Sequence, residues 1–189
     1  MDWSAFQLGF WHPFGPHGNE SREDILGRKN REIAANDGWT LWSFQFRTVI
    51  PLWQQILADA QLSCFVLCSD SPGAREPRGA ITRCAEYRVA EEAPWLRLPE
   101  AISVPHPFGR RRQGSAFVVE DIVRVGADQQ PAFGVEWSSV NVWRTGSLPT
   151  RGEYLIRRGG ASRPRRVFAV LRLRAPYVVW IRPMANESN

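Results

Sequence analysis

The sequence is short of lysine, histidine and cysteine. Of its 24 basic residues only Lys29 is a lysine, and it has three histidines and three cysteines. An odd number of cysteines argues against a disulfide framework. No apolar run approaches the roughly 18 residues that cross a bilayer, and the opening MDWSAFQLGFW lacks the basic segment of a signal peptide. These shortages predict a cytoplasmic protein without a membrane span.

Several motifs of common enzyme classes are also missing. The chain has no glycine-rich dinucleotide fingerprint and no alternation of strand and helix patterns, which argues against a doubly wound parallel sheet. It has no serine-nucleophile elbow, and no spacing links a serine and an acid to a histidine. We therefore expect neither a nucleotide-binding α/β enzyme nor a serine hydrolase.

What the sequence does contain indicates one packed domain over residues 1–189. Its hydrophobic fraction is 43% and it has nine tryptophans, enough for one sizeable core. The formal net charge of +5 favours an anionic partner. Two segments stand apart from the expected core: an aromatic, turn-rich N-terminal segment (1–20) that would cover the main body, and a long irregular basic loop (90–114).

The periodicity predicts an α+β fold with a mixed or antiparallel sheet, curled toward a small barrel and flanked by two or three helices. Ser21 and Asp24 fit a capping box, which predicts a helix over 21–36 that ends at Asn36-Asp37-Gly38. Pro51 predicts the start of a second helix, which extends to about Ala60. Alternating or apolar runs predict strands at 39–46, 63–68, 81–89, 115–125, 135–143, 153–158, 167–174 and 177–182.

All three histidines lie in or just after an HPFG tetrapeptide. His12 begins the first copy, His17 follows it, and His106 begins the second. The three could converge with Glu20 on a metal or provide a catalytic histidine at His12 or His106. Alternatively, proline and glycine are common turn residues and both segments are simply turns. No tight pair of ligands signals a metal, so we predict neither a metal site nor a cofactor.

One segment of the predicted first helix carries a family resemblance. Residues 25–32, ILGRKNRE, followed by the strand WTLWSF, resemble the G-x-K-x-x-E segment of ASCH domains. This family belongs to the PUA-like superfamily of small β-barrels with flanking helices. The resemblance implies an RNA-related role or hydrolysis of amide bonds in modified nucleosides, with Lys29 and Glu32 in the family's cleft. Asn30 is a departure, because the family commonly has threonine after that lysine.

The residues themselves leave two interpretations of Lys29 and Glu32 open. Three positions apart on a helix, they share a face and can pair. They form either a solvated ion pair of little energetic value or a functional pair, in which Lys29 contacts a phosphate or a base, or has a pKa lowered by a cleft and acts as a base. Lys29, Glu32, His12 and His106 are therefore the catalytic candidates.

Basic clusters and tryptophans favour binding to a nucleic acid, with RNA preferred over DNA, or to a nucleotide-like small molecule. Arginine can contact phosphates through two parallel hydrogen bonds, and tryptophan can stack on an unpaired base. The candidate contacts are Arg28, Lys29, Trp39, Trp42, Arg110, Arg111, Arg112, Arg163, Arg165 and Arg166. The leading hypothesis is a PUA/ASCH-like module that binds RNA, a nucleotide or a modified base in a cleft beside helix 21–36. The alternatives are a small hydrolase of a nucleoside-like substrate and a protein-interaction module.

Overall fold

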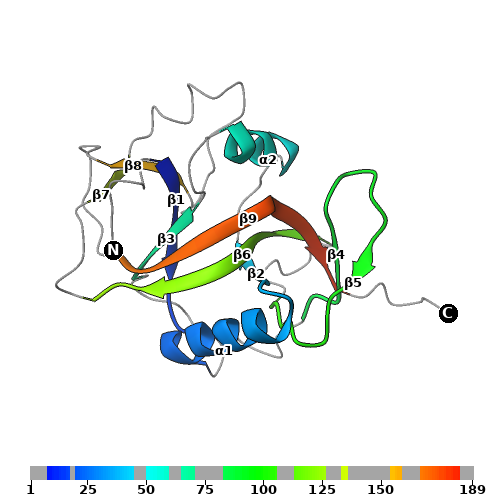
Figure 1. The fold of residues 1–189 in the computed structure, drawn as a ribbon, viewed down its shortest axis with the longest axis horizontal. Coiled ribbons are helices and arrows are strands. Elements are labelled where there is room, and N and C mark those ends of the chain that lie inside the picture. The colour runs from blue at the N-terminus through cyan, green and yellow to red at the C-terminus, as the bar shows by residue number, and fades with distance from the viewer. Residues whose placement is uncertain are drawn as a thin grey trace.

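A computed structural model describes residues 8–17, 20–44, 50–59, 65–70, 83–105, 113–126, 133–135, 154–158 and 167–183. These residues form an α+β fold in which two helices accompany one mixed sheet (Figure 1). In chain order the elements are β1 (Leu8–Phe14), α1 (Arg22–Ala35), β2 (Thr40–Phe44), α2 (Ile50–Asp59), β3 (Phe65–Asp70), β4 (Glu86–Arg88), β5 (Leu96–Arg97), β6 (Gly114–Arg124), β7 (Phe133–Val135), β8 (Tyr154–Arg158) and β9 (Val167–Arg182). The predicted α+β class is confirmed. None of these helices is long and apolar enough to span a membrane.

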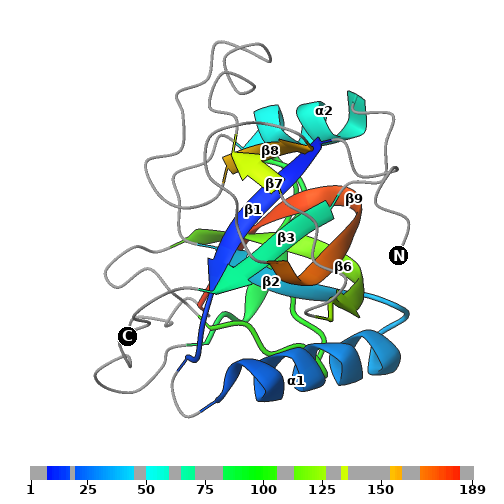
Figure 2. The same ribbon diagram turned by 90° about the vertical axis from the view of Figure 1, so that its left-hand side faces the viewer.

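The strands follow the order β2-β6-β9-β3-β1-β8-β7, with β4 paired to β9 and β5 to β4. The β1–β3 pair is parallel and the other pairs are antiparallel, so the sheet is mixed. Among the described strands, β2 and β7 end the order and do not pair with each other, so these pairings do not close a barrel. Figure 2 shows α1 and α2 far apart, with the strands between them.

The longest strand, β9, joins two strands that the sequence predicts as separate. Its first half pairs with β3 and its second half with β4, while β6 runs along the other side of both halves. The pairing with β3 ends at Arg172 and the pairing with β4 begins at Trp180, and Pro176, which has no N–H to donate, lies between them. The proline that predicts a strand end thus lies inside one continuous strand.

The N-terminal segment is corrected by the structure. Residues 8–14 are not a turn-rich cover but the strand β1, inside the sheet between β3 and β8. Pro13 misleads the prediction, because proline usually ends a strand. Here it is tolerated since β8 pairs only with residues 8–11 and leaves β1 a single neighbour at Pro13.

Other predicted strands also differ in extent from the observed ones. Of the described residues of the predicted strand 81–89, residues 86–88 form β4, and the predicted loop 90–114 contains β5, which pairs with β4. The other described residues of this loop up to 113 lie outside the helices and strands, as predicted, and Gly114 begins β6. The strands predicted at 39–46, 63–68, 115–125 and 153–158 correspond to β2, β3, β6 and β8. Of the strand predicted at 135–143 only Val135 is described, as the last residue of β7, and the other residues lie outside the described ranges.

Helix α1 has the predicted beginning and end. The side chain of Ser21 accepts a hydrogen bond from the Asp24 backbone, and the Asp24 carboxylate accepts one from the Ser21 N–H. At the other end the Gly38 N–H donates to the Ile33 carbonyl, with Gly38 at a φ of 79° that suits glycine. These two ends fix the helix that carries the candidate site.

The sheet around β2, β6 and β9 is covered on both faces by apolar side chains. One cluster contains Ile25 and Leu26 of α1 with Trp42 and Phe44 of β2. A second cluster contains Leu41 of β2 with Cys84, Ile102 and Val104 from the segments beside β4 and β5. Helix α1 packs next to β2 and β6. Arg28 and Lys29 of α1 also donate to the carbonyl of Ser103, so the helix contacts the segment around Ile102 as well as the sheet.

Substituting Ser21→Ala should lower the free energy of unfolding by about 1 kcal/mol, because it removes the N-cap acceptor. Ser21→Thr keeps the acceptor and should change stability by only a few tenths of a kcal/mol. Urea denaturation followed by circular dichroism measures both variants. Equal stability of the alanine variant and the wild type would show that α1 does not depend on this cap.

Candidate functional site

The inner face of α1 carries two charged residues as well as apolar ones. Ile25, Leu26, Lys29 and Glu32 are the buried residues of the helix, at the spacing of one helical face. Lys29 is 3% exposed and Glu32 is 4% exposed. The pair predicted from the spacing therefore forms, but it is buried, and the alternative of a solvated ion pair is wrong.

The Lys29 ammonium group has three partners. Its Nζ donates to Glu32 Oε2 at 2.7 Å and to the Ser103 carbonyl at 2.9 Å, and it lies 3.4 Å from Thr40 Oγ1. An ammonium group has three N–H bonds, so these contacts use its full capacity. Lys29 can contact a ligand only by exchanging one of them.

Glu32 is the centre of the cluster. Its Oε2 accepts from Lys29 and, at 2.5 Å, from the Thr40 hydroxyl, while its Oε1 accepts from Arg28 NH1 at 2.7 Å. Thr40 is itself fully buried at the start of β2. A buried carboxylate needs such partners, because leaving it uncompensated is strongly destabilising.

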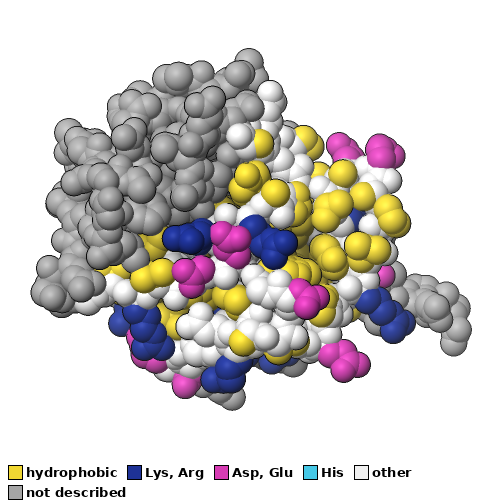
Figure 3. Space-filling view, in the orientation of Figure 1, with side chains coloured by type: hydrophobic (Ala, Val, Ile, Leu, Met, Phe, Trp, Pro, Cys, Tyr) yellow, Lys and Arg dark blue, Asp and Glu magenta, His cyan; other side chains and the backbone are white. Residues whose placement is uncertain are grey.

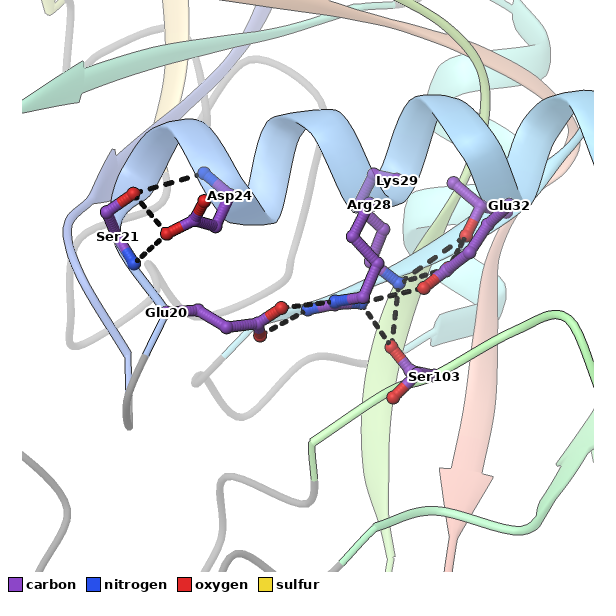
Figure 4. Close-up of polar contacts among 8 residues, drawn as sticks. Glu20, Ser21, Asp24, Arg28, Lys29, Glu32 and Ser103 are labelled. Atoms are coloured by element: carbon purple, nitrogen blue, oxygen red, sulfur yellow. Dashed lines mark hydrogen bonds and ion pairs between the residues drawn. The ribbon is translucent and has the colours of Figure 1, made fainter.

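Arg28 connects this buried centre to the solvent. Its NH1 donates to Glu32 and to the Ser103 carbonyl, and its Nε and NH2 donate to the two carboxylate oxygens of Glu20 at 2.7 and 2.9 Å. Figure 4 shows the guanidinium between Glu20 on one side and Glu32 with Ser103 on the other. The side chains of Arg28 and Glu20 are 20% and 35% exposed, so this is the accessible end of the cluster.

The electrostatics of the cluster are set by burial and by pairing. Burial lowers the pKa of Lys29 to about 8, although Glu32 favours its charged form. The pKa of Glu20 is lowered, chiefly by its hydrogen bond from Arg28. Two cations and two carboxylates balance when Lys29 is protonated. A lysine whose pKa is lowered toward neutral pH has a property required of a general base.

The structure separates the two candidate tryptophans. Trp42 is 4% exposed in the apolar core, so the prediction that it stacks on a base is corrected: both faces of β2 are covered. Trp39 is half-buried and lies against Tyr87 with ring centroids 5.8 Å apart. Trp39 therefore remains the accessible candidate of the two.

The candidate histidines are not assembled into a metal site in the part of the chain that the structure describes. His12 is buried, with its ring edge-on to Trp42 at 6.3 Å. His17 is half-buried next to Glu20, to which it is joined by two backbone hydrogen bonds. No group of three metal-ligating side chains occurs among the described residues. His106, Arg110, Arg111, Arg112, Arg163, Arg165 and Arg166 lie outside them.

Sequence reasoning misses two members of the cluster, Thr40 and Ser103, and considers Glu20 only as a metal ligand. Thr40 follows Trp39 at the start of a predicted strand, close enough in sequence to α1 to be a candidate for the helix-facing position. Ser103 contributes a backbone carbonyl and comes from a position 75 residues after Arg28. A carbonyl is present in every residue, so no sequence signal could have identified it.

The stability of the protein should rise with pH above about 8 because of Lys29. Its folded-state pKa is about 8, below its usual 10.5, so between these values the unfolded chain binds more protons than the folded one. The free energy of unfolding should therefore increase by on the order of 1 kcal/mol per pH unit in this window. Lys29→Met should lack this rise, whereas Arg31→Met, an exposed substitution on the same helix, should keep it.

Urea unfolding of the wild type and both variants between pH 7 and pH 10 measures the difference. The comparison between variants is needed because burial also raises the pKa of Cys84 to about 12, which lowers stability as the pH rises above the usual thiol range. All three proteins share that effect. Parallel curves for the wild type and Lys29→Met would contradict the lowered pKa of Lys29.

No similarity to a known protein indicates a function for this chain, so a functional proposal rests on the residues of the cluster. No protein-family model matches the chain, and neither a curated protein nor a solved structure matches it. The resemblance of residues 25–32 and the following strand to ASCH domains therefore stays a prediction from the sequence.

Proposed function

We propose that this protein is a PUA/ASCH-like module that binds RNA, or a nucleotide or modified base, beside α1. The observation that supports it best is the convergence of Lys29 and Glu32 on one buried polar cluster with Arg28 and Thr40. Both residues belong to the segment that resembles ASCH domains. The β2–β6–β9 part of the sheet would be the PUA-like core, with α1 as its flanking helix.

The cost of burying charge supports a function for this cluster. Well-packed apolar residues often stabilise a protein as much as a buried ion pair does, or more. Perturbed titratable groups with specific charged partners are concentrated at binding and catalytic sites. Arg28 reaches the solvent and is held from inside by Glu32, so it is the donor of the cluster that a base or a phosphate can contact.

Part of the proposal concerns basic residues beyond the described ranges. Arg110, Arg111 and Arg112 follow the loop segment that provides Ser103, and Arg163, Arg165 and Arg166 precede β9. In this proposal they contact phosphates through charge and so raise affinity without selecting sequence. The face over β6 and β9 in Figure 3 differs, because its basic side chains are interspersed with acidic ones.

Affinity for labelled single-stranded RNA should fall steeply between about 50 and 200 mM salt, since phosphate contacts release counterions. Changing Arg110, Arg111 and Arg112 together to alanine should reduce the salt slope. The matched control replaces three exposed arginines elsewhere, Arg97, Arg172 and Arg174, and should keep the slope. Fluorescence anisotropy with RNA and with duplex DNA measures each, and the RNA should bind more tightly.

No binding of either polymer at low salt would contradict the polymer-binding form of the proposal. An equal loss of slope in both triple variants would show that net charge, and not the 110–112 segment, provides the affinity. If neither polymer binds, the next ligands to test are single nucleosides and nucleotides, which would contact the cluster around Arg28.

A second candidate function, hydrolysis of an amide bond in a nucleoside-like substrate, is favoured by Thr40. Its hydroxyl lies 3.4 Å from Lys29 Nζ and donates to Glu32. The neutral Lys29 amine could take the hydroxyl proton while Thr40 Oγ1 attacks the amide carbon and the C–N bond breaks. Lys29 would return the proton to the departing nitrogen, and water would then hydrolyse the ester on Thr40. Thr40 is fully buried, however, so this reaction requires the cluster to open. Binding is therefore the first proposal and hydrolysis the second.

The hydrolase function makes a distinct prediction. Thr40→Ser keeps a hydroxyl and should keep turnover of nucleosides acylated on an exocyclic amine, whereas Thr40→Val should lose it by at least about a hundredfold. The rate should rise with pH through about 8, where Lys29 loses its proton. Product formation followed by liquid chromatography decides, with circular dichroism to confirm folding. Equal rates for the serine and valine variants would exclude Thr40 as the nucleophile.

A further inference from the structure

The guanidinium of Arg28 has two edges with different partners. The NH1 end faces inward, where it donates to Glu32 Oε1 at 2.7 Å and to the Ser103 carbonyl at 3.0 Å. The edge formed by Nε and NH2 faces outward and is occupied by the two oxygens of Glu20. Figure 4 shows the two sets of partners on opposite sides of the group.

The inward partners suffice to hold Arg28 in place. Glu32 is 4% exposed and is itself fixed by Lys29 and Thr40. The Ser103 carbonyl lies between Ile102 and Val104, which are both buried in the second apolar cluster. These inward contacts at NH1 do not involve Glu20, so they remain if Glu20 moves away.

Among the four charged residues of the cluster, Glu20 has the most exposed side chain. Its side chain is 35% exposed, and its backbone, just before α1, is joined to that of His17 by two hydrogen bonds. Burial lowers the pKa of His17 below its usual value of 6.5, so its imidazole is neutral at pH values above 6.5. The charges within the hydrogen-bonded cluster balance, but Arg83, outside it, also favours the ionised form of Glu20 together with Arg28 and Lys29. Counting Arg83, three cations face the two carboxylates of Glu20 and Glu32.

We propose that the outer edge of Arg28 is the point at which the protein binds a phosphate group, and that Glu20 is the resident competitor for it. Two phosphate oxygens can accept from Nε and NH2 in the same paired geometry as a carboxylate. The phosphate displaces the Glu20 side chain into solvent and finds a local excess of positive charge. As a statement about nucleotide or RNA phosphates this rests on the proposed function, but the phosphate contact itself can be tested alone.

The test is a titration of the full-length protein with inorganic phosphate at constant ionic strength, followed by NMR of the arginine Nε–Hε signals. The Arg28 signal is identified by its loss in Arg28→Lys. Phosphate should shift it in the wild type, and Glu20→Gln should bind phosphate about fivefold more tightly, the factor expected for loss of a partly exposed competing ion pair. Glu23→Gln, which removes an exposed carboxylate of α1, should leave the affinity for phosphate within twofold of the wild type.

Two results would overturn the proposal. One is equal tightening by Glu20→Gln and Glu23→Gln, which would reflect net charge alone. The other is an Arg28 signal that phosphate does not move in the wild type, a measurement that holds even if Glu20→Gln fails to fold. RNA binding without any shift at Arg28 would refute this inference and leave the proposed function standing. Phosphate binding at Arg28 without RNA binding would support the inference and contradict the polymer-binding form of the function.

Discussion

The buried contact between Lys29 and Glu32 is the constraint on which the arrangement around α1 depends. Ile25 and Leu26 drive the helix onto the sheet, but apolar burial is not directional and tolerates small rotations. Two opposite charges on the same face do not tolerate them. Removing one member of such a pair leaves a buried charge without compensation, at a cost of about 3–5 kcal/mol. The pair therefore fixes how α1 lies against Thr40 at the start of β2.

The same contact extends order to a distant part of the chain. The Ser103 carbonyl accepts from both Arg28 and Lys29, and its neighbours Ile102 and Val104 are buried in the second apolar cluster. The polar cluster thus links α1, which packs on one face of the sheet, to a segment that packs on the other. An irregular segment that would otherwise be defined only by its flanking apolar residues gains a directional anchor.

The sequence predicts this region well where the determinants are local. The capping box at Ser21 and the glycine at Gly38 define α1, and the spacing of Lys29 and Glu32 predicts their pairing. Burial of the pair is not predictable from that spacing, because residues three apart share a helical face whether it is wet or dry. The contact with Ser103 depends on how the whole chain closes. The prediction that Trp42 stacks on a base is wrong for a related reason, since alternation in a strand does not say which of its faces are covered.

Burial divides the cluster into two parts with different consequences for binding. Lys29, Glu32 and Thr40 have nearly all of their hydrogen-bonding capacity satisfied by one another and by Ser103, so they resist exchange with a ligand and serve to position. Arg28 shares both environments, with one end held by that satisfied centre and one edge at the solvent boundary. A cation oriented in advance loses little rotational freedom when it binds an anion, which is why preorganisation raises affinity. The buried charges, costly in themselves, thus produce a directed donor at the surface that an apolar face of α1 could not hold in place.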